Sequence, residues 1–218
     1  RQVLHETSVP RLRISSLQPQ EISDELVGLW DNPRLCPHFH LPLQSGSMDV
    51  LRAMRRRYTP NQYIEAVQFI RNHVPRASVT ADVIVGFPGE SDNDFHDTYE
   101  VCKHVKFADL HVFPYSTRPG TTAAYLTPKI AGQVKNLRMK QLLALREQQQ
   151  HSYREDLLGS ICPVLWEKSL FEGEYTRWSG LTDNYIRVWT TSESSLHNRI
   201  TPVELQYQDE TRIWGRIV

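Results

Sequence analysis

Residues 78–91 read Ser-Val-Thr-Ala-Asp-Val-Ile-Val-Gly-Phe-Pro-Gly-Glu-Ser, and this stretch decides how the chain folds. Its first part, 78–85, is rich in β-branched side chains and is typical of a strand. Gly86 and Gly89, with Pro88 between them, predict a tight turn at the end of that strand. Ser91 is then a suitable cap for the start of a helix. A strand that turns directly into a helix is typical of a parallel sheet built from βα units.

The same alternation of strand and helix patterns extends through residue 115. It contains four β-like runs, at 11–17, 38–43, 78–85 and 109–113. Before the third run, Thr59-Pro60-Asn61-Gln62 is a capping box with proline at the first helical position. Repeated βα units predict an α/β fold in which the strands are parallel and the helices pack on the sheet.

The four runs place apolar and polar residues on opposite faces, at a period of two residues. The apolar set is Leu12, Ile14, Phe39, Leu41, Leu43, Val79, Val83, Val85, Leu110 and Val112. The polar set is Arg13, Ser15, His38, His40, Gln44, Thr80, Asp82, His111 and Tyr115. Because a closed barrel fills its interior with branched aliphatic residues, the polar set predicts an open barrel that holds a polar ligand. We expect its histidines to be hydrogen-bonded residues rather than metal ligands.

The chain changes character after a long helical pattern at 129–156, which Gly159 ends. Short strand patterns separated by turn signals then follow, at 162–167, 171–178, 185–189, 203–207 and 213–218. Short strands in succession predict a small all-β barrel. We therefore expect two domains, residues 1–156 and residues 157–218.

Composition limits the possible classes of protein. The 25 basic and 25 acidic residues cancel, so net charge gives no sign of nucleic-acid binding. The three cysteines, Cys36, Cys102 and Cys162, are odd in number and far apart, which fits a cytoplasmic protein and no metal site. No apolar run approaches the ~18 residues that span a bilayer, so we expect no membrane partner. The chain opens on Arg1, and we expect it to be a fragment of a longer protein.

Three segments carry a family resemblance: His40-Leu-Pro-Leu-Gln-Ser-Gly46, residues 82–90, and His-Val-Phe-Pro-Tyr-Ser-Thr-Arg-Pro-Gly-Thr-Thr at 111–122. Together they resemble the radical-SAM methylthiotransferases that modify tRNA, and most closely the MtaB type, which acts on N6-threonylcarbamoyladenosine at position 37. Residues 37–40 and 111–116 favour that type. Residues 44–47 are shared with the MiaB type, which acts on isopentenyladenosine, so that type is the alternative.

The resemblance implies that the first domain is the C-terminal part of an open radical-SAM (βα) barrel that binds S-adenosylmethionine. It implies a site made of Gln44 and Ser45 at the ribose, Ile84 against the adenine, and the Phe113 and Pro114 backbone at the adenine edge, with Gly86 allowing close approach. Asp82 is either a further cofactor contact or a polar residue bonded to His40 or His111. Without the resemblance, residues 86–89 read as a tight turn and residues 44–45 as a strand-end cap.

The second domain resembles, at residues 178–188, the signature of the TRAM domain, a small RNA-binding β-barrel. Alternation places Tyr185, Arg187 and Trp189 on one face, where they suit stacking on unpaired bases and holding phosphates. The other interpretation of such a row is cross-strand packing. Arg118 could pair with an RNA phosphate or a substrate carboxylate. The basic run Arg52, Arg55, Arg56 and Arg57 is interpreted as a solvated helix face.

By resemblance, the intact protein cleaves S-adenosylmethionine to a 5′-deoxyadenosyl radical and inserts a methylthio group at carbon 2 of adenosine 37 in tRNA. It would hold two 4Fe-4S clusters, whose cysteine ligands are not in this chain, so we expect the chain alone to be inactive. No catalytic residue is assigned, and nothing in the sequence indicates an oligomeric state. The competing hypothesis is a non-catalytic RNA-binding module with the barrel as a scaffold.

Overall fold

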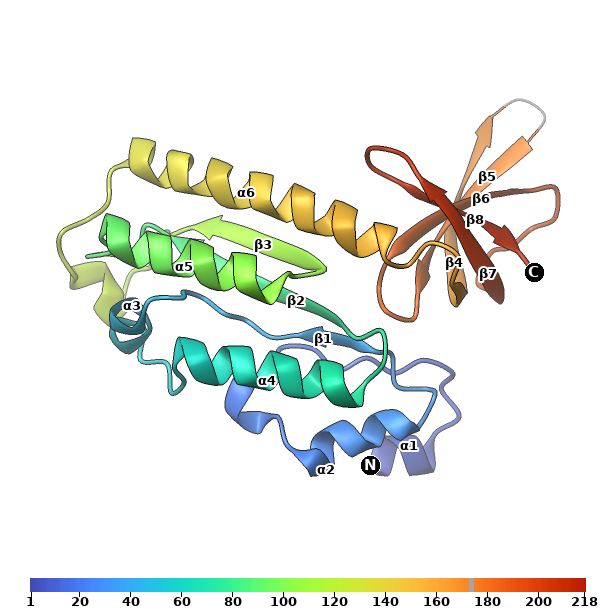
Figure 1. The fold of residues 1–218 in the computed structure, drawn as a ribbon, viewed down its shortest axis with the longest axis horizontal. Helices are drawn as coiled ribbons and strands as arrows, with labels where there is room; N and C mark the ends of the chain where they lie inside the picture. Colours follow the sequence, from blue (N-terminus) through green and yellow to red (C-terminus); the bar gives the residue numbers. More distant parts are fainter. Residues whose placement is uncertain (173–174) are drawn as a thin grey trace.

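A computed structural model describes residues 1–172 and 175–218. A three-stranded sheet with helices on one side is followed by a closed five-stranded barrel (Figure 1). This mixed α/β arrangement, ending in a small barrel, confirms the expected order of the two parts. No helix among the described residues is long and apolar enough to cross a membrane.

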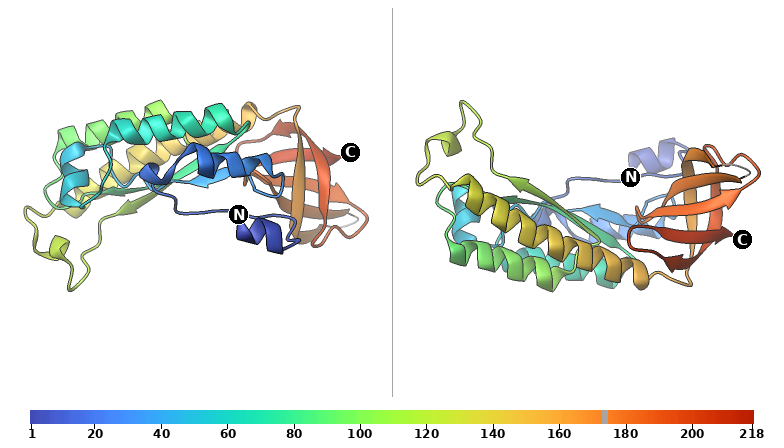
Figure 2. Two further views of the ribbon diagram at one scale, coloured as in Figure 1. Left: turned by 90° about the horizontal axis from the view of Figure 1, so that it is seen from below. Right: turned by 90° about the horizontal axis from the view of Figure 1, so that it is seen from above.

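The sheet consists of β1 (His38–His40), β2 (Ser78–Val85) and β3 (Asp109–Pro114), which are parallel and lie in that order. The helices around it are α3 (Met48–Ala53), α4 (Pro60–His73), α5 (Asp92–Val105) and α6 (Gly132–Glu155). Capping boxes begin α4 at Thr59 and α5 at Ser91, as predicted. Figure 2 shows the helices on one side of the sheet, while the loop after β3 and the N-terminal segment project on the other side.

The prediction of a fourth strand at 11–17 is wrong. Leu12 makes one isolated bridge with Leu35, and a left-handed φ of 61° at Ser16 interrupts the extended backbone. The N-terminal segment instead contains short helices, α1 (Gln2–Glu6), η1 (Pro19–Glu21), α2 (Asp24–Val27) and η2 (Gly28–Asp31). The structure therefore has three strands where the sequence predicts four, and β1 ends at His40.

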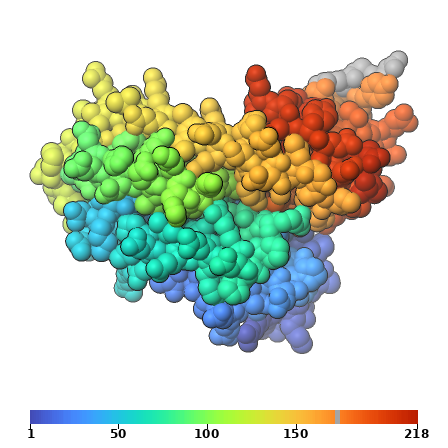
Figure 3. Space-filling model, viewed as in Figure 1, coloured from blue at the N-terminus to red at the C-terminus, as the bar shows by residue number. Residues whose placement is uncertain are grey.

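The predicted separation of faces is confirmed for the three strands. The side chains facing the helices, such as Phe39, Val79, Val83 and Leu110, are fully buried in one apolar cluster. Buried residues of α4, α5 and α6 complete that cluster, and Figure 3 shows the three helices forming one continuous surface in the view of Figure 1. The opposite face, called the open face below, carries His38, His40, Thr80, Asp82 and His111.

The barrel contains β4 (Ile161–Glu172), β5 (Tyr175–Thr182), β6 (Arg187–Ser192), β7 (Ile200–Gln208) and β8 (Ile213–Ile217). It closes in the order β4-β5-β6-β8-β7 around an apolar core that includes Trp166, Val188 and Leu205. The sequence predicts a strand from residue 185, but β6 begins at Arg187. Tyr185 has a left-handed φ of 70° in the turn before β6, so it does not share the alternation of that strand.

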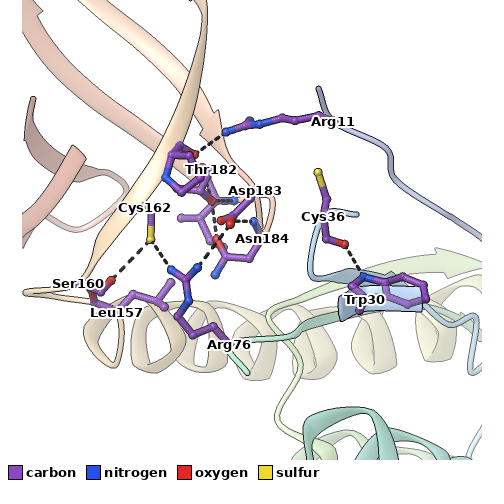
Figure 4. Close-up of polar contacts among 12 residues, drawn as sticks. Arg11, Trp30, Cys36, Arg76, Leu157, Ser160, Cys162, Thr182, Asp183 and Asn184 are labelled. Atoms are coloured by element: carbon purple, nitrogen blue, oxygen red, sulfur yellow. Dashed lines mark hydrogen bonds and ion pairs between the residues drawn. The ribbon is translucent and has the colours of Figure 1, made fainter. Parts of the chain in front are cut away.

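Two arginines attach the barrel to the amino ends of the sheet strands (Figure 4). Arg11 donates to the Leu181 carbonyl (2.8 Å) and to the Pro163 carbonyl. Arg76 lies 3.0 Å from Cys162 Sγ and 3.4 Å from an Asp183 carboxylate oxygen. Because each guanidinium is bonded across the junction, the barrel is fixed at the end of the sheet opposite the strands' carboxyl ends.

Candidate functional site

A cavity of about 570 Å³ lies where β2 and β3 end. Its lining includes six residues that the sequence singles out: Gln44, Asp82, Ile84, Phe113, Pro114 and Arg118. They come from three segments that are distant in sequence and meet because parallel strands end at one edge of the sheet. That edge is where α/β folds bind ligands.

Backbone pairing positions these side chains. The Gln44 N–H donates to the Asp82 carbonyl (2.8 Å), and the Ile84 N–H donates to the Gln44 carbonyl (2.9 Å). Ile84 is in register with Phe113, whose side chain is 49% exposed. One amide and two apolar side chains therefore converge on the cavity.

Ser45 and Gly86 do not line this cavity. Ser45 is fully buried with its hydroxyl 3.1 Å from that of Thr98 on α5. Gly86 has a φ of +73°, and a Cβ there would lie 2.4 Å from Cγ of Lys135 on α6. The structure thus places Ser45 against α5, and it places Gly86 in a turn that packs against α6.

The loop after Gly86 is held by a buried ion pair that the sequence analysis missed. Glu90 accepts from the Gly86 N–H (2.7 Å) and from Arg138 (2.5 Å), and both charged side chains are almost fully buried. Arg138 also binds Asp92 (2.7 Å). Burial raises the pKa of Glu90, while the Gly86 N–H and Arg138 act in the opposite direction. The only signal in the sequence was the position of Glu90 within the 82–90 segment.

A chain of polar contacts follows the open face from the barrel to the cavity. The Thr80 hydroxyl lies 3.1 Å from both His38 Nε2 and His40 Nδ1. Asp82 then lies between His40 (3.3 Å) and His111 (3.1 Å). Burial, and next the positive charge of Arg13, lowers the pKa of His38 to about 4. Asp82 is thus bonded to both histidines and also lines the cavity.

His40, Asp82 and His111 each offer one donor atom within 4.8 Å of the others. Two imidazoles and a carboxylate form a donor set that suits iron(II) or zinc. In this structure each Asp82 oxygen faces one imidazole at hydrogen-bonding distance, and that pairing accounts for the arrangement.

The three cysteines do not converge. Cys102 is buried in the sheet core, where desolvation raises the pKa of its thiol, and Cys162 is buried in the barrel core. Cys36 is buried elsewhere, in the N-terminal segment, as Figure 4 shows. An iron–sulfur cluster requires several thiolates around one centre, so these residues do not fit one.

The structure separates one residue of the predicted RNA-binding row, Tyr185, from the other two, Arg187 and Trp189. Tyr185 lies at the junction, where its ring stacks on His38 (4.8 Å between centroids) under the Arg13 guanidinium (3.7 Å). Arg187 and Trp189 do share the outer face of β6, and Arg187 pairs with Glu167 (2.8 Å). Trp189 contacts two further side chains that the sequence analysis missed, Trp214 (6.4 Å) and Arg212 (4.8 Å).

Comparison with known proteins finds one matching family model and a similar solved structure. Residues 6–102 match the Radical SAM superfamily. Among solved structures, coproporphyrinogen III oxidase (HemN) from Escherichia coli, described as a Radical SAM enzyme, aligns with a TM-score of 0.54 at 15% identity. That alignment covers 79% of this chain and 46% of HemN, and it shows a shared fold. The chain is therefore similar in sequence to the Radical SAM superfamily over residues 6–102.

Sequence comparison also finds relatives that are named for a particular reaction. The threonylcarbamoyladenosine tRNA methylthiotransferase MtaB of Bacillus subtilis is 37% identical over 90% of this chain and 44% of its own length. The tRNA-2-methylthio-N(6)-dimethylallyladenosine synthase of Syntrophotalea carbinolica is 37% identical over 94% of this chain and 47% of its own. The corresponding Agrobacterium fabrum synthase is 45% identical over 72% of this chain and 35% of its own. The chain is thus similar to these enzymes over most of its own length and spans less than half of theirs.

Proposed function

We propose that this chain forms the substrate-side part of a radical-SAM tRNA methylthiotransferase acting on adenosine 37. The observation that carries the proposal is the cavity at the carboxyl ends of β2 and β3. Gln44, Ile84, Phe113 and Pro114, each expected at an S-adenosylmethionine site by resemblance, line that one cavity. The homologues named above support the same assignment.

The cavity residues fit a nucleoside cofactor. Ile84 and the exposed face of Phe113 offer apolar contacts to an adenine, and the Gln44 amide can hydrogen-bond a ribose hydroxyl. S-adenosylmethionine would supply radical chemistry there when it is bound beside an iron–sulfur cluster. The cysteines of this chain fit no cluster, so we assign the ligands of two 4Fe-4S clusters to the rest of the protein, without which this chain is inactive.

Arg118 favours the MtaB type of substrate. Arg118 lines the cavity, and its guanidinium has neither a hydrogen bond nor an ion pair among the described residues. A threonylcarbamoyl group carries a carboxylate, which arginine binds bidentately, whereas an isopentenyl group carries no charge. The MiaB type remains the second candidate because its members match this chain at similar identity.

We further propose that residues 157–218 form a TRAM domain that holds the tRNA. The closed five-stranded barrel supports this assignment. The position of Arg187 and Trp189 on the same outer face of β6 supports it as well. Tyr185 would join this outer face of β6 only if its ring moved away from the His38 ring. Its ring stacks on His38 in this structure, so we assign Tyr185 to the junction between the sheet and the barrel.

Mass spectrometry of tRNA nucleosides tests the proposal in cells that lack the whole gene. We expect loss of 2-methylthio-N6-threonylcarbamoyladenosine, with its unthiolated precursor accumulating. Arg118→Gln in the restored gene should reduce the product, and Arg57→Gln, which lies at a different cavity, is the charge-matched control. Loss of the isopentenyl nucleoside instead would establish the MiaB type. An unchanged nucleoside profile, with tRNA still bound by the protein, would favour the non-catalytic RNA-binding module.

A further inference from the structure

A second cavity, of about 260 Å³, adjoins the first one. The two cavities share the lining residues Gln44, Ile84, Tyr115 and Ala123. The second cavity is bounded by Arg55 and Arg56, which follow α3, whereas Arg118 lines the first. Three arginines, called the mouth arginines below, therefore line two adjoining cavities.

The mouth arginines differ from most arginines of the chain. Among the described residues, only Arg55, Arg56, Arg57, Arg118 and Arg199 have a side chain with no hydrogen bond, ion pair or ring contact. Three of these five line the two cavities. The one acidic residue in that lining is Asp82, which is already paired with His40 and His111. The two cavities therefore have an excess of positive charge that the fold does not neutralise.

The backbone at Arg55 adopts a conformation that glycine favours. The Arg55 N–H donates to the Arg52 carbonyl (2.9 Å) and the Arg56 N–H to the Leu51 carbonyl (2.9 Å), so α3 ends in a Schellman motif. Arg55 occupies its left-handed position with a φ of 58°, where glycine is favoured. An arginine held in an unfavourable backbone conformation at a cavity is expected where its side chain has a role.

Exposed aromatic rings accompany these charges. Phe113 borders the first cavity with 49% of its surface exposed, and Tyr125, in the η3 segment (Thr122–Tyr125), is 81% exposed. Unpaired guanidinium groups with exposed aromatic rings suit a single-stranded nucleic acid, whose phosphates and bases they bind. We propose that Arg55 and Arg56, in the cavity that adjoins the one lined by Arg118, bind the phosphodiester backbone of single-stranded RNA that flanks the nucleotide in the first cavity. This inference rests on the proposed function.

Arg57 provides a matched control because it belongs to the same segment but lines a different cavity, with Tyr58 and Pro19. Fluorescence anisotropy would measure binding of a labelled anticodon stem-loop RNA to the intact protein at several salt concentrations. We expect Arg55→Gln and Arg56→Gln to weaken binding about tenfold each. In the double variant, the slope of log affinity on log salt should fall by ~1.4, since two phosphate contacts are lost. Arg57→Gln should bind like the wild type.

Arg55→Gly separates binding from folding. Glycine relieves the left-handed backbone, so the melting temperature should be unchanged or higher while RNA affinity falls as in Arg55→Gln. Binding by the double variant that equals that of Arg57→Gln would overturn the inference and leave the proposed function standing. Failure of the intact wild-type protein to bind the RNA would overturn both. If the double variant loses S-adenosylmethionine in equilibrium dialysis but keeps RNA, the arginines bind the cofactor carboxylate, and the inference is wrong.

Discussion

At the amino ends of the sheet strands, where the barrel packs, Arg11 and Arg76 are bonded to protein atoms across the junction. At the carboxyl ends, Arg55, Arg56 and Arg118 line cavities and have no such partner in the part of the chain that the structure describes. The open face connects the two ends through one chain of polar contacts. The difference separates arginines that stabilise the fold from arginines that remain available to a ligand.

The comparison predicts opposite results for a paired and an unpaired arginine, Arg138 and Arg118. Arg138→Leu leaves Glu90 buried without its charged partner, so the free energy of unfolding should fall by about 3–5 kcal/mol at neutral pH. Arg118→Gln should change it by less than about 0.5 kcal/mol, because Arg118 has no partner to lose. Urea denaturation of both variants measures the difference.

Two controls for that experiment depend on Glu90, namely the pH dependence of the Arg138→Leu effect and a double variant that also replaces Glu90. Its folded pKa is already raised by burial, and the loss of Arg138 raises it further. The penalty in Arg138→Leu should therefore shrink as the pH falls and Glu90 takes up a proton. The double variant Glu90→Gln/Arg138→Leu should lose less stability than Arg138→Leu alone. Equal losses in the single and double variants would mean that packing, rather than the charge pair, holds the loop.

The contribution of His38, at the barrel end of the sheet, can be tested through the pH dependence of stability. The folded state keeps His38 neutral down to about pH 4, whereas an unfolded histidine takes up a proton near its ordinary value of 6.5. Stability from this residue is therefore complete above pH 6.5 and is lost as the pH falls from 6.5 toward 4, by about 3 kcal/mol in total. Denaturation of wild type and His38→Gln at several pH values measures it. If both proteins lose stability in parallel over that window, His38 is not the group responsible.

Local signals in the sequence predicted much of this fold. The capping boxes at Thr59 and Ser91 and the strand at 78–85 involve neighbours within a few residues, so they could be recognised without the tertiary structure. The segment at 11–17 could not, since its alternation resembles a strand while its backbone lacks a continuous partner.

The candidate site, like the fold, could be predicted from the sequence only where local patterns determine it. Alternation predicted the polar side of the sheet, and the segments at 44, 82–84 and 113–118 do meet around one cavity. Which arginine has a partner depends on contacts between distant residues, such as Arg138 with Glu90 and Arg187 with Glu167. Sequence spacing carries no information on those contacts, and for that reason the basic run at 52–57 was interpreted as a solvated face.

The smallest effect is expected on the barrel, where Arg187 can be converted from a paired arginine into a free one. Arg187 and Glu167 are both partly exposed, so Glu167→Gln should change stability by at most about 1 kcal/mol. If the outer face of β6 contacts tRNA, the freed guanidinium should raise the affinity of the intact protein by about 1.5- to fivefold. The salt dependence should become steeper by ~0.7, because one more phosphate is bound. Glu204→Gln, which frees Arg216 in the same way, is the control. An equal gain in both variants would reflect the loss of negative charge from the barrel as a whole, and no gain in either would place the RNA on another surface.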